Sequence, residues 1–182
     1  MVDGTLIKET GATFTPPGLA NFLARQIFEN LDVSDTTSRL SILDPACGDG
    51  QLLCAIYDVL KKQGMSHCHL NGYDSNPQFL KEAKSNFSKK SIHNFSLNKG
   101  DFLDQFDSGE MTQKSLFNDL SDVFDIVIAN PPYVRTQILG TEKAQKIAKK
   151  FNLKGRVDLY YPFPDCNGLR SWKGQRVAAV SP

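Results

Sequence analysis

The sequence predicts an α/β protein built on a doubly wound, mostly parallel sheet. Strand-like and helical periods alternate four or five times along the 182 residues, which is typical of strands connected by crossover helices. Several of the strand-like segments also end on polar or glycine-rich turns. In doubly wound sheets ligands sit beyond the carboxyl ends of the strands, so these turns are where a functional site is expected.

Length and composition indicate a single globular domain over residues 1–182. The chain is 40% hydrophobic and 23% charged, which is ordinary for a soluble protein with a real core. We find neither a signal-peptide pattern nor an apolar run of membrane-spanning length in the sequence. The expected location is the cytoplasm, with no membrane partner.

The first half of the chain contains two predicted helices around one predicted strand. In residues 16–31, Pro17 suits a first helical turn, and apolar residues recur at helical spacing at Leu19, Phe22, Leu23, Ile27 and Leu31. Residues 39–44 predict a short buried strand that ends at Asp44. The helix expected after Gly50 has an apolar stripe formed by Leu52, Leu53, Ile56, Tyr57 and Leu60.

The second half continues the alternation less regularly. Residues 68–74 and 95–101 predict strands, and a helix over 77–87 between them opens with Pro77. The run at 123–130 is the clearest strand, because Val123, Ile126, Val127 and Ile128 suit a parallel strand covered on both faces. Beyond it we expect a basic helix near 141–151, an irregular or helical piece at 158–163, and a last strand at 175–180 on an exposed sheet edge. Residues 102–121 give no clear signal.

Cysteine and histidine spacing does not indicate a metal site or disulfides. No CxxC pair occurs among the four cysteines, so they are predicted to be buried or half-buried free thiols. His67 and His69 would share one face of a strand without a third ligand. We expect no metal.

The turn DPACGDG at residues 44–50 favours a positively charged nucleoside ligand. Gly48 and Gly50 flank a tight strand-to-helix turn where a ligand can approach the backbone. The third glycine of a dinucleotide fingerprint is absent, since position 53 is Leu53, and no P-loop lysine is present. Asp44 suits a cationic group, and Asp74, at the end of the next strand, could accept hydrogen bonds from ribose hydroxyls. S-adenosylmethionine fits both requirements.

The second turn of interest, NPPY at residues 130–133, follows the clearest strand. Taken alone it is most often a plain turn. Together with DPACGDG and with TFTPPGLANFLA at residues 13–24, it resembles the adenine-specific DNA methyltransferases of type II restriction-modification and phage-defence systems. The segments NPPYVR and FNLKGRVDLYYPF are also similar to these enzymes, so the resemblance extends from Thr13 to Tyr161.

The resemblance implies a Rossmann-like methyltransferase fold, S-adenosylmethionine as cofactor, and a flipped adenine of DNA as substrate. Asp49 departs from the family pattern, where Ser or Thr is frequent, but Asp can also cap a helix start. The residues implied in cofactor binding are Phe14, Thr15 and Pro16 at the methionine end, Asp44, Ala46, Gly48 and Gly50 in the glycine turn, Asp74 at the ribose, and Asp101 and Phe102 at the adenine ring. The implied catalytic turn is Asn130, Pro131, Pro132 and Tyr133.

A basic stretch follows the NPPY turn. Between Arg135 and Arg156 seven basic residues stand against one acidic residue, which gives this window a net charge of +6. A solvated amphipathic helix would show the same pattern. We expect phosphate contacts from Arg135, Lys143, Lys146, Lys150 and Lys154.

Two departures from the family predict an incomplete catalytic core. Family members continue past a strand such as the one at 175–180 with further strands and a DNA-reading domain, and Pro162 and Pro164 interrupt an expected helix. We therefore expect the last strands and the target-recognition domain to be missing, with a separate recognition subunit or nuclease as a possible partner. The alternatives are methylation of a protein glutamine or an RNA guanine, and an inactive cofactor-binding remnant.

Overall fold

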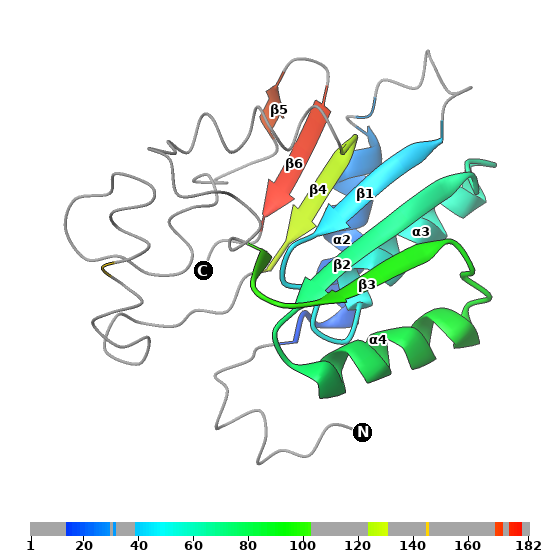
Figure 1. The fold of residues 1–182 in the computed structure, drawn as a ribbon. Helices are drawn as coiled ribbons and strands as arrows, with labels where there is room; N and C mark the ends of the chain where they lie inside the picture. Colours follow the sequence, from blue (N-terminus) through cyan, green and yellow to red (C-terminus); the bar gives the residue numbers. More distant parts are fainter. Residues whose placement is uncertain are drawn as a thin grey trace.

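A six-stranded sheet forms the centre of the described part of the protein (Figure 1). The computed structural model describes residues 14–29, 31, 39–102, 124–130, 145, 170–172 and 175–179. The strand order is β3-β2-β1-β4-β6-β5, and all neighbours are parallel except β5 and β6. The strands are β1 (Leu40–Asp44), β2 (Cys68–Asp74), β3 (Phe95–Lys99), β4 (Ile126–Ala129), β5 (Arg170–Trp172) and β6 (Gln175–Ala179). The predicted mostly parallel α/β sheet is thus confirmed.

The expectation that the last strand would form the sheet edge is wrong. β6 pairs with β4 on one side and with β5, antiparallel, on the other. β5 precedes β6 by a short connection, and the antiparallel pairing satisfies the outer backbone groups of β6. No apolar periodicity marked the three residues of β5 as a strand, so the sequence reading missed it.

Three helices pack against the core on one side of the sheet. They are α2 (Pro17–Glu29), α3 (Gln51–Lys62) and α4 (Pro77–Lys89). In Figure 1, α2 and α3 lie behind the strands and α4 lies below β3. The predicted proline starts of α2 and α4 are confirmed, and the Asn76 side chain caps α4 by accepting a hydrogen bond from the Gln78 backbone N–H at 2.9 Å. Of the helices in the described ranges, none has the length and apolar character needed to cross a bilayer. Of the basic helix expected near 141–151 the structure describes only Gln145, which is helical and exposed, and the irregular or helical piece expected at 158–163 lies outside the described residues.

The buried face of α2 agrees with the predicted one at Leu23 and Ile27, and Leu31 beyond the helix end also packs against the core, but two other positions differ. Leu19 and Phe22 are 37% and 58% exposed, whereas Ala20, Ala24 and Ile27 are fully buried. Small residues on the inner face allow α2 to approach α3 closely, because alanine side chains leave room for the neighbouring helix backbone. The leucine and phenylalanine therefore point away from the contact.

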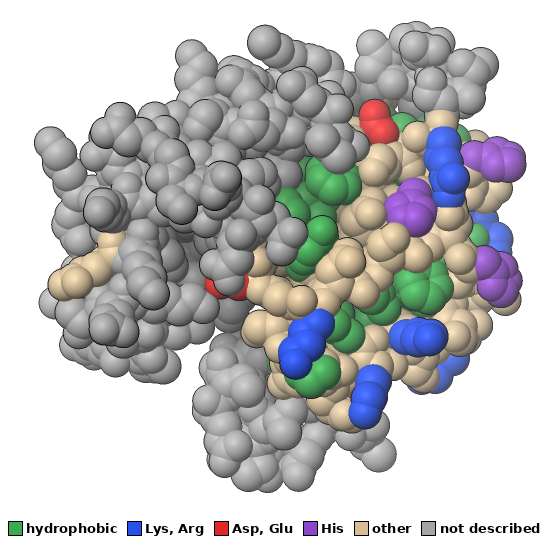
Figure 2. Space-filling view, viewed as in Figure 1, with side chains coloured by type: hydrophobic (Ala, Val, Ile, Leu, Met, Phe, Trp, Pro, Cys, Tyr) green, Lys and Arg blue, Asp and Glu red, His purple; other side chains and the backbone are tan. Residues whose placement is uncertain are grey.

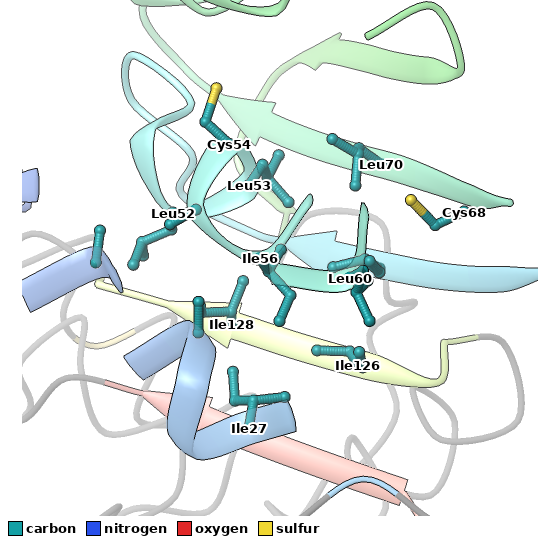
Figure 3. Close-up of a cluster of buried hydrophobic side chains, with 14 of the residues drawn as sticks. Ile27, Leu52, Leu53, Cys54, Ile56, Leu60, Cys68, Leu70, Ile126 and Ile128 are labelled. Atoms are coloured by element: carbon teal, nitrogen blue, oxygen red, sulfur yellow. The ribbon is translucent and has the colours of Figure 1, made fainter. Parts of the chain in front are cut away.

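The core lies between these helices and one face of the sheet (Figure 3). Ile42, Leu70 and the pair Ile126 and Ile128 come from three neighbouring strands and meet the predicted stripe of α3. Cys47, Cys54 and Cys68 are buried free thiols, as predicted, while Cys166 lies outside the described residues. Burial of each large aliphatic side chain contributes about 1.5–3 kcal/mol to folding.

The opposite face of the sheet is more polar (Figure 2). Histidine side chains, drawn in purple, lie on the part of this face away from the grey residues. His69 is 2.9 Å from both the Asn94 Oδ1 and Ser96 Oγ atoms, and Arg39 also contacts Asn94. Across the described ranges, no group of three or more His, Cys, Asp or Glu side chains could hold a metal ion.

The pairing of β1 with β4 determines where the site forms. The chain runs from β1 outward to β2 and β3, then returns to place β4 on the other side of β1. Asp125 fixes this pairing, since its Oδ2 accepts the Ser41 N–H at 2.7 Å and its own N–H donates to the Ser41 carbonyl at 2.9 Å. The reversal of strand order between β1 and β4 is a topological switch point, where α/β proteins bind ligands.

Candidate active site

A pocket opens at the carboxyl ends of β1 and β4 and contains about 250 Å³ of empty space, counted to its open mouth. Three separate parts of the chain line it: the segment before α2, the turn from β1 into α3, and the end of β4. The lining residues are Phe14, Thr15, Asp44, Ala46, Cys47, Gly48, Asp49, Gln51, Leu52 and Asn130. The predicted glycine turn and the predicted catalytic asparagine therefore face one cavity.

The end of β1 carries a buried carboxyl group in this pocket. Asp44 is 1% exposed, its Oδ1 accepts the Ala46 N–H at 3.1 Å, and its Oδ2 has no hydrogen-bond partner within the described ranges. Burial raises the pKa of Asp44 from 3.8 to about 8, and the nearby negative charges of Asp74 and Asp49 add to the rise. A cationic ligand group would satisfy the free oxygen and stabilise the ionised carboxylate.

The raised pKa of Asp44 predicts a pH-dependent stability. The pKa of Asp44 is about 8 in the folded state, against an ordinary value of 3.8. The protonated carboxyl group therefore contributes its full share to folding stability below pH 3.8, and this contribution is lost as the pH rises through the folded-state pKa. Asp44→Asn should therefore gain stability relative to wild type between about pH 5 and about pH 8, by about 1.4 kcal/mol for each step of one pH unit. Urea unfolding at both pH values measures this difference.

The control for that measurement is Glu29→Gln, at the exposed end of α2. Its stability relative to wild type should be the same at both pH values. A constant difference between Asp44→Asn and wild type would contradict the raised pKa.

The glycine turn is held by backbone hydrogen bonds to the end of β2. Asp74 Oδ2 accepts the Gly48 N–H at 2.9 Å, and Oδ1 accepts the Asn76 N–H at 2.8 Å. The Asp74 carbonyl accepts the Gly100 N–H at 3.0 Å. Burial raises the pKa of Asp74 above its ordinary value, and the two N–H donors oppose that rise. Asp74 thus joins the ends of three strands, a role that the sequence did not indicate.

Glycine is required at the two positions of the turn for different structural reasons. Gly48 has φ +53°, and a Cβ there would lie 3.4 Å from the Phe14 ring, which covers this side of the turn. Gly50 has φ +77°, and a Cβ there would lie 2.8 Å from the Phe87 ring and 3.1 Å from the Ala83 Cβ. Gly50 therefore allows α4 to pack against the start of α3, and it does not line the pocket.

Gly50→Ala should lower the free energy of unfolding by about 2 kcal/mol, because it combines a left-handed backbone with a clash in the core. Two controls separate these effects in chemical unfolding. Gly64→Ala has the same φ sign, at +78°, with open space around it, and should cost about 1 kcal/mol. Gly18→Ala, in α2 with nothing within 4 Å, should be neutral or stabilising. Equal losses at positions 50 and 64 would show that the contact with Phe87 is unimportant.

The end of β4 contributes the side-chain amide of Asn130, of which only the N–H end has a partner within the described residues. The Nδ2 of Asn130 donates to Thr15 Oγ1 at 2.9 Å, while its Oδ1 is buried and has no partner in the described part of the chain. Thr15 is itself 7% exposed. The site therefore presents a carbonyl oxygen of Asn130 and a carboxyl oxygen of Asp44, neither of which has a hydrogen-bond partner among the described residues, and both residues line one pocket.

The predicted site residues divide into three groups. The pocket brings together Phe14, Thr15, Asp44, Ala46, Gly48 and Asn130. Pro16, Gly50, Asp74, Asp101 and Phe102 do not line it; the Pro16 carbonyl accepts the Ala20 N–H at the start of α2, and Phe102 packs edge-on against Tyr73 at 4.9 Å. The residues Pro131, Pro132, Tyr133, Arg135, Lys143, Lys146, Lys150 and Lys154 lie outside the described residues.

Sequence reasoning missed several residues that shape the pocket. Cys47 lines it, and burial raises the pKa of its thiol well above the ordinary value, so it behaves as a small apolar group. A Cβ at Gly72 would lie 2.9 Å from the Cys47 Sγ, so the bare backbone of β2 makes room for the turn. Asp49 accepts the Gln51 N–H at 3.2 Å, but the N-cap position of α3 is Gly50 and no side chain among the described residues caps the helix, so the expected capping by Asp49 is wrong. The sequence signal for the close approach of Cys47 to β2 was the glycine at position 72, inside the predicted strand 68–74.

Comparison with known proteins places the chain in a family. The family model described as N-6 DNA Methylase matches residues 4–160. Type II methyltransferase M.BanIII of Aneurinibacillus aneurinilyticus is 44% identical over 180 residues, which are 96% of this chain and 30% of that protein. Type II methyltransferase M.BstVI of Geobacillus stearothermophilus is 29% identical over 185 residues, covering 84% of this chain and 30% of that protein.

A solved structure supports the fold. The crystal structure of a putative class I S-adenosylmethionine-dependent methyltransferase from Listeria monocytogenes matches with a TM-score of 0.51 and 19% identity, over 87% of this chain and 45% of that one. At this identity the likeness concerns the fold alone. The chain spans about 30% of the length of the two curated relatives.

Proposed function

Because the chain belongs to the N-6 DNA methylase family, we propose that it is the catalytic part of a DNA methyltransferase of a restriction-modification or phage-defence system. The proposed reaction transfers a methyl group from S-adenosylmethionine to the exocyclic amine of an adenine in DNA. The substrate implies that the protein works in the cytoplasm. We propose that a further domain or a separate subunit, outside these 182 residues, recognises the DNA sequence. A nuclease is a second proposed partner.

The observation that carries this proposal is the orientation of the Asn130 amide. Its N–H donates to Thr15, and its buried carbonyl oxygen has no partner in the part of the chain that the structure describes. An unpaired buried acceptor costs about 1–3 kcal/mol, so a ligand that donates a hydrogen bond there is expected. The amine of adenine is such a donor.

The chemistry of the pocket lining also suits the proposed cofactor. When bound, S-adenosylmethionine supplies an electrophilic methyl group on a positively charged sulfur. The unpaired Oδ2 of Asp44 suits a cationic part of this molecule, and the glycine turn between Ala46 and Gly48 offers backbone at the start of α3. Phe14, packed edge-on against Phe79 at 5.0 Å, would form an apolar wall.

The residues of the turn after β4 would activate the acceptor amine. The lone pair of an adenine amine is delocalised into the ring, which makes it a poor nucleophile. Asn130 Oδ1 would accept one N–H, and the Pro131 carbonyl is proposed to accept the other, so that the nitrogen becomes more tetrahedral and its lone pair is directed toward the methyl donor. Proton loss follows transfer, so no strong general base is required.

Access to the amine requires the base to leave the duplex. Flipping costs a few kcal/mol, and stacking on the ring of Tyr133 would offset about 1–3 kcal/mol of it. The basic residues Arg135, Lys143, Lys146, Lys150 and Lys154 are proposed to contact phosphates. Their contribution would appear as a decrease in DNA affinity with increasing salt.

Methyl transfer from tritiated S-adenosylmethionine tests the proposal. The substrates are an adenine-containing duplex, the same duplex with N6-methyladenine at every adenine, a guanine-rich RNA, and a glutamine-containing peptide. Label on the first duplex alone supports adenine methylation. Label on the RNA or the peptide would favour the alternative acceptors, and cofactor binding in calorimetry without any transfer, with or without the recognition subunit, would favour an inactive remnant.

A further inference from the structure

We infer that Thr15 is a positioning residue that fixes the orientation of the Asn130 amide for catalysis. The inference rests on the proposed function and deepens it. The resemblance implied only that Thr15 lines the cofactor. In the structure Thr15 lines the pocket, and its hydroxyl oxygen also accepts a 2.9 Å hydrogen bond from Asn130 Nδ2, across 115 positions of sequence.

Both partners of this hydrogen bond have a restricted backbone. Thr15 is followed by Pro16 and Pro17, and Asn130 is followed by Pro131 and Pro132. A residue before proline is limited to extended conformations, and a β-branched threonine has few χ1 rotamers. The two side chains therefore meet from two stiff segments.

The segment that carries Thr15 is also anchored on both sides. Before it, the Phe14 ring packs against Phe79 at 5.0 Å and covers Gly48. After it, the Pro16 carbonyl accepts the Ala20 N–H at 3.0 Å, which ties the segment to the first turn of α2. The Thr15 hydroxyl, in a residue that is 7% exposed, is thus held in a fixed place by packing and by the helix start.

A fixed hydroxyl matters because an amide has two chemically different ends. With Nδ2 bonded to Thr15, the buried Oδ1 is the end left for a ligand. If the amide turned over, two N–H donors would face the substrate amine, which is itself a donor. The lone pair of that amine could not then be directed by acceptance of its hydrogens. A hydroxyl can accept from Nδ2 or donate to Oδ1, so Thr15 holds the amide plane in place, and the Nδ2–Oγ1 bond seen in the structure leaves the productive Oδ1 end for the substrate.

Three variants test this role by steady-state kinetics and calorimetry. Thr15→Val keeps the shape and removes the hydroxyl; it should lower kcat by about 10- to 100-fold while KM for DNA and the cofactor Kd change by less than about threefold. Thr15→Ser should restore most of kcat. The control Ser96→Ala removes a hydroxyl that also makes a 2.9 Å contact, to His69 on the far face, and should leave kcat unchanged.

Coupling to Asn130 is tested in the double variant. If Thr15 acts through the amide, Thr15→Val should cost nothing further in an Asn130→Ala background. A full additional loss there, or a loss of cofactor affinity in place of kcat, would overturn the inference and make Thr15 a cofactor ligand.

A second readout does not depend on methyl transfer, so failure of the proposed function and failure of this inference remain distinguishable. In the isotope-labelled protein, one Asn130 side-chain N–H proton should be shifted downfield and slow to exchange with solvent. This signature should be lost in Thr15→Val and kept in Thr15→Ser. If the Asn130 resonances were the same in all three proteins, Thr15 would not hold the amide, whether or not the chain methylates DNA.

Discussion

Asn130→Ala is expected to lower methyl transfer to adenine-containing DNA by about 10²- to 10³-fold, while the affinity for S-adenosylmethionine changes by no more than a few fold. The side chain removed is the buried acceptor at the end of β4, whose Oδ1 has no partner within the described ranges. Its loss leaves the substrate amine without one of its two proposed acceptors. Tritiated methyl transfer under saturating cofactor measures the rate, and calorimetry measures the affinity.

The matched control is Asn71→Ala, another half-buried asparagine of the sheet. Asn71 donates to the Ser41 hydroxyl and to the Ile42 carbonyl within the sheet, away from the pocket. It should lower stability but leave kcat close to wild type in the folded fraction. Equal losses of cofactor affinity and of transfer in Asn130→Ala would instead place this residue in the cofactor cradle.

Asp74→Ala is expected to weaken cofactor binding by about 10- to 100-fold and to lower the melting temperature as well. Both of its carboxylate oxygens accept backbone N–H groups, from Gly48 and Asn76, and a hydrogen bond to a charged group contributes about 1.5–3 kcal/mol. Without the hydrogen bond to Gly48, the turn that lines the pocket is no longer held in its position. Asp74→Asn should be milder, because the amide oxygen can keep one of the two bonds.

A cofactor analogue separates this positioning role from direct contact with the ribose. S-adenosylhomocysteine and its 2′-deoxy form are titrated into wild type and Asp74→Ala. If Asp74 also binds the ribose, the missing hydroxyl should weaken binding to wild type by about tenfold and have little effect in the variant. The same loss in both proteins would mean that Asp74 acts only through the turn.

Local chemistry made most of the site residues predictable. Asp44 and Asn130 each follow a run of buried residues, and glycine or proline after such a run indicates a turn at a strand end. The start of α2 at Pro17 and of α4 at Pro77 were predictable for the same reason, because proline fits the first helical turn. These features depend on residues next to one another in the chain.

Other features could not be read from neighbouring residues. The exposure of Leu19 and Phe22 follows from the close approach of α2 to α3, which apolar periodicity alone does not reveal. The pairing of the short β5 with β6 has no local signal in three residues. The glycine at position 72 indicates a close approach to the strand, but only the fold shows that the Cys47 side chain occupies the space beside it.

By itself, the sequence determined the alternation of strands and helices, the polar turns after the strands, and the motifs of the N-6 DNA methylase family. Only the tertiary structure decided that β1 and β4 are neighbours, so that Asp44 and Asn130, each with an oxygen unpaired within the described ranges, line one pocket, and that Thr15 bonds the asparagine amide. The physical reason is that propensity and turn chemistry act between adjacent residues. Strand order and side-chain contacts depend instead on how buried surfaces far apart in the chain pack together.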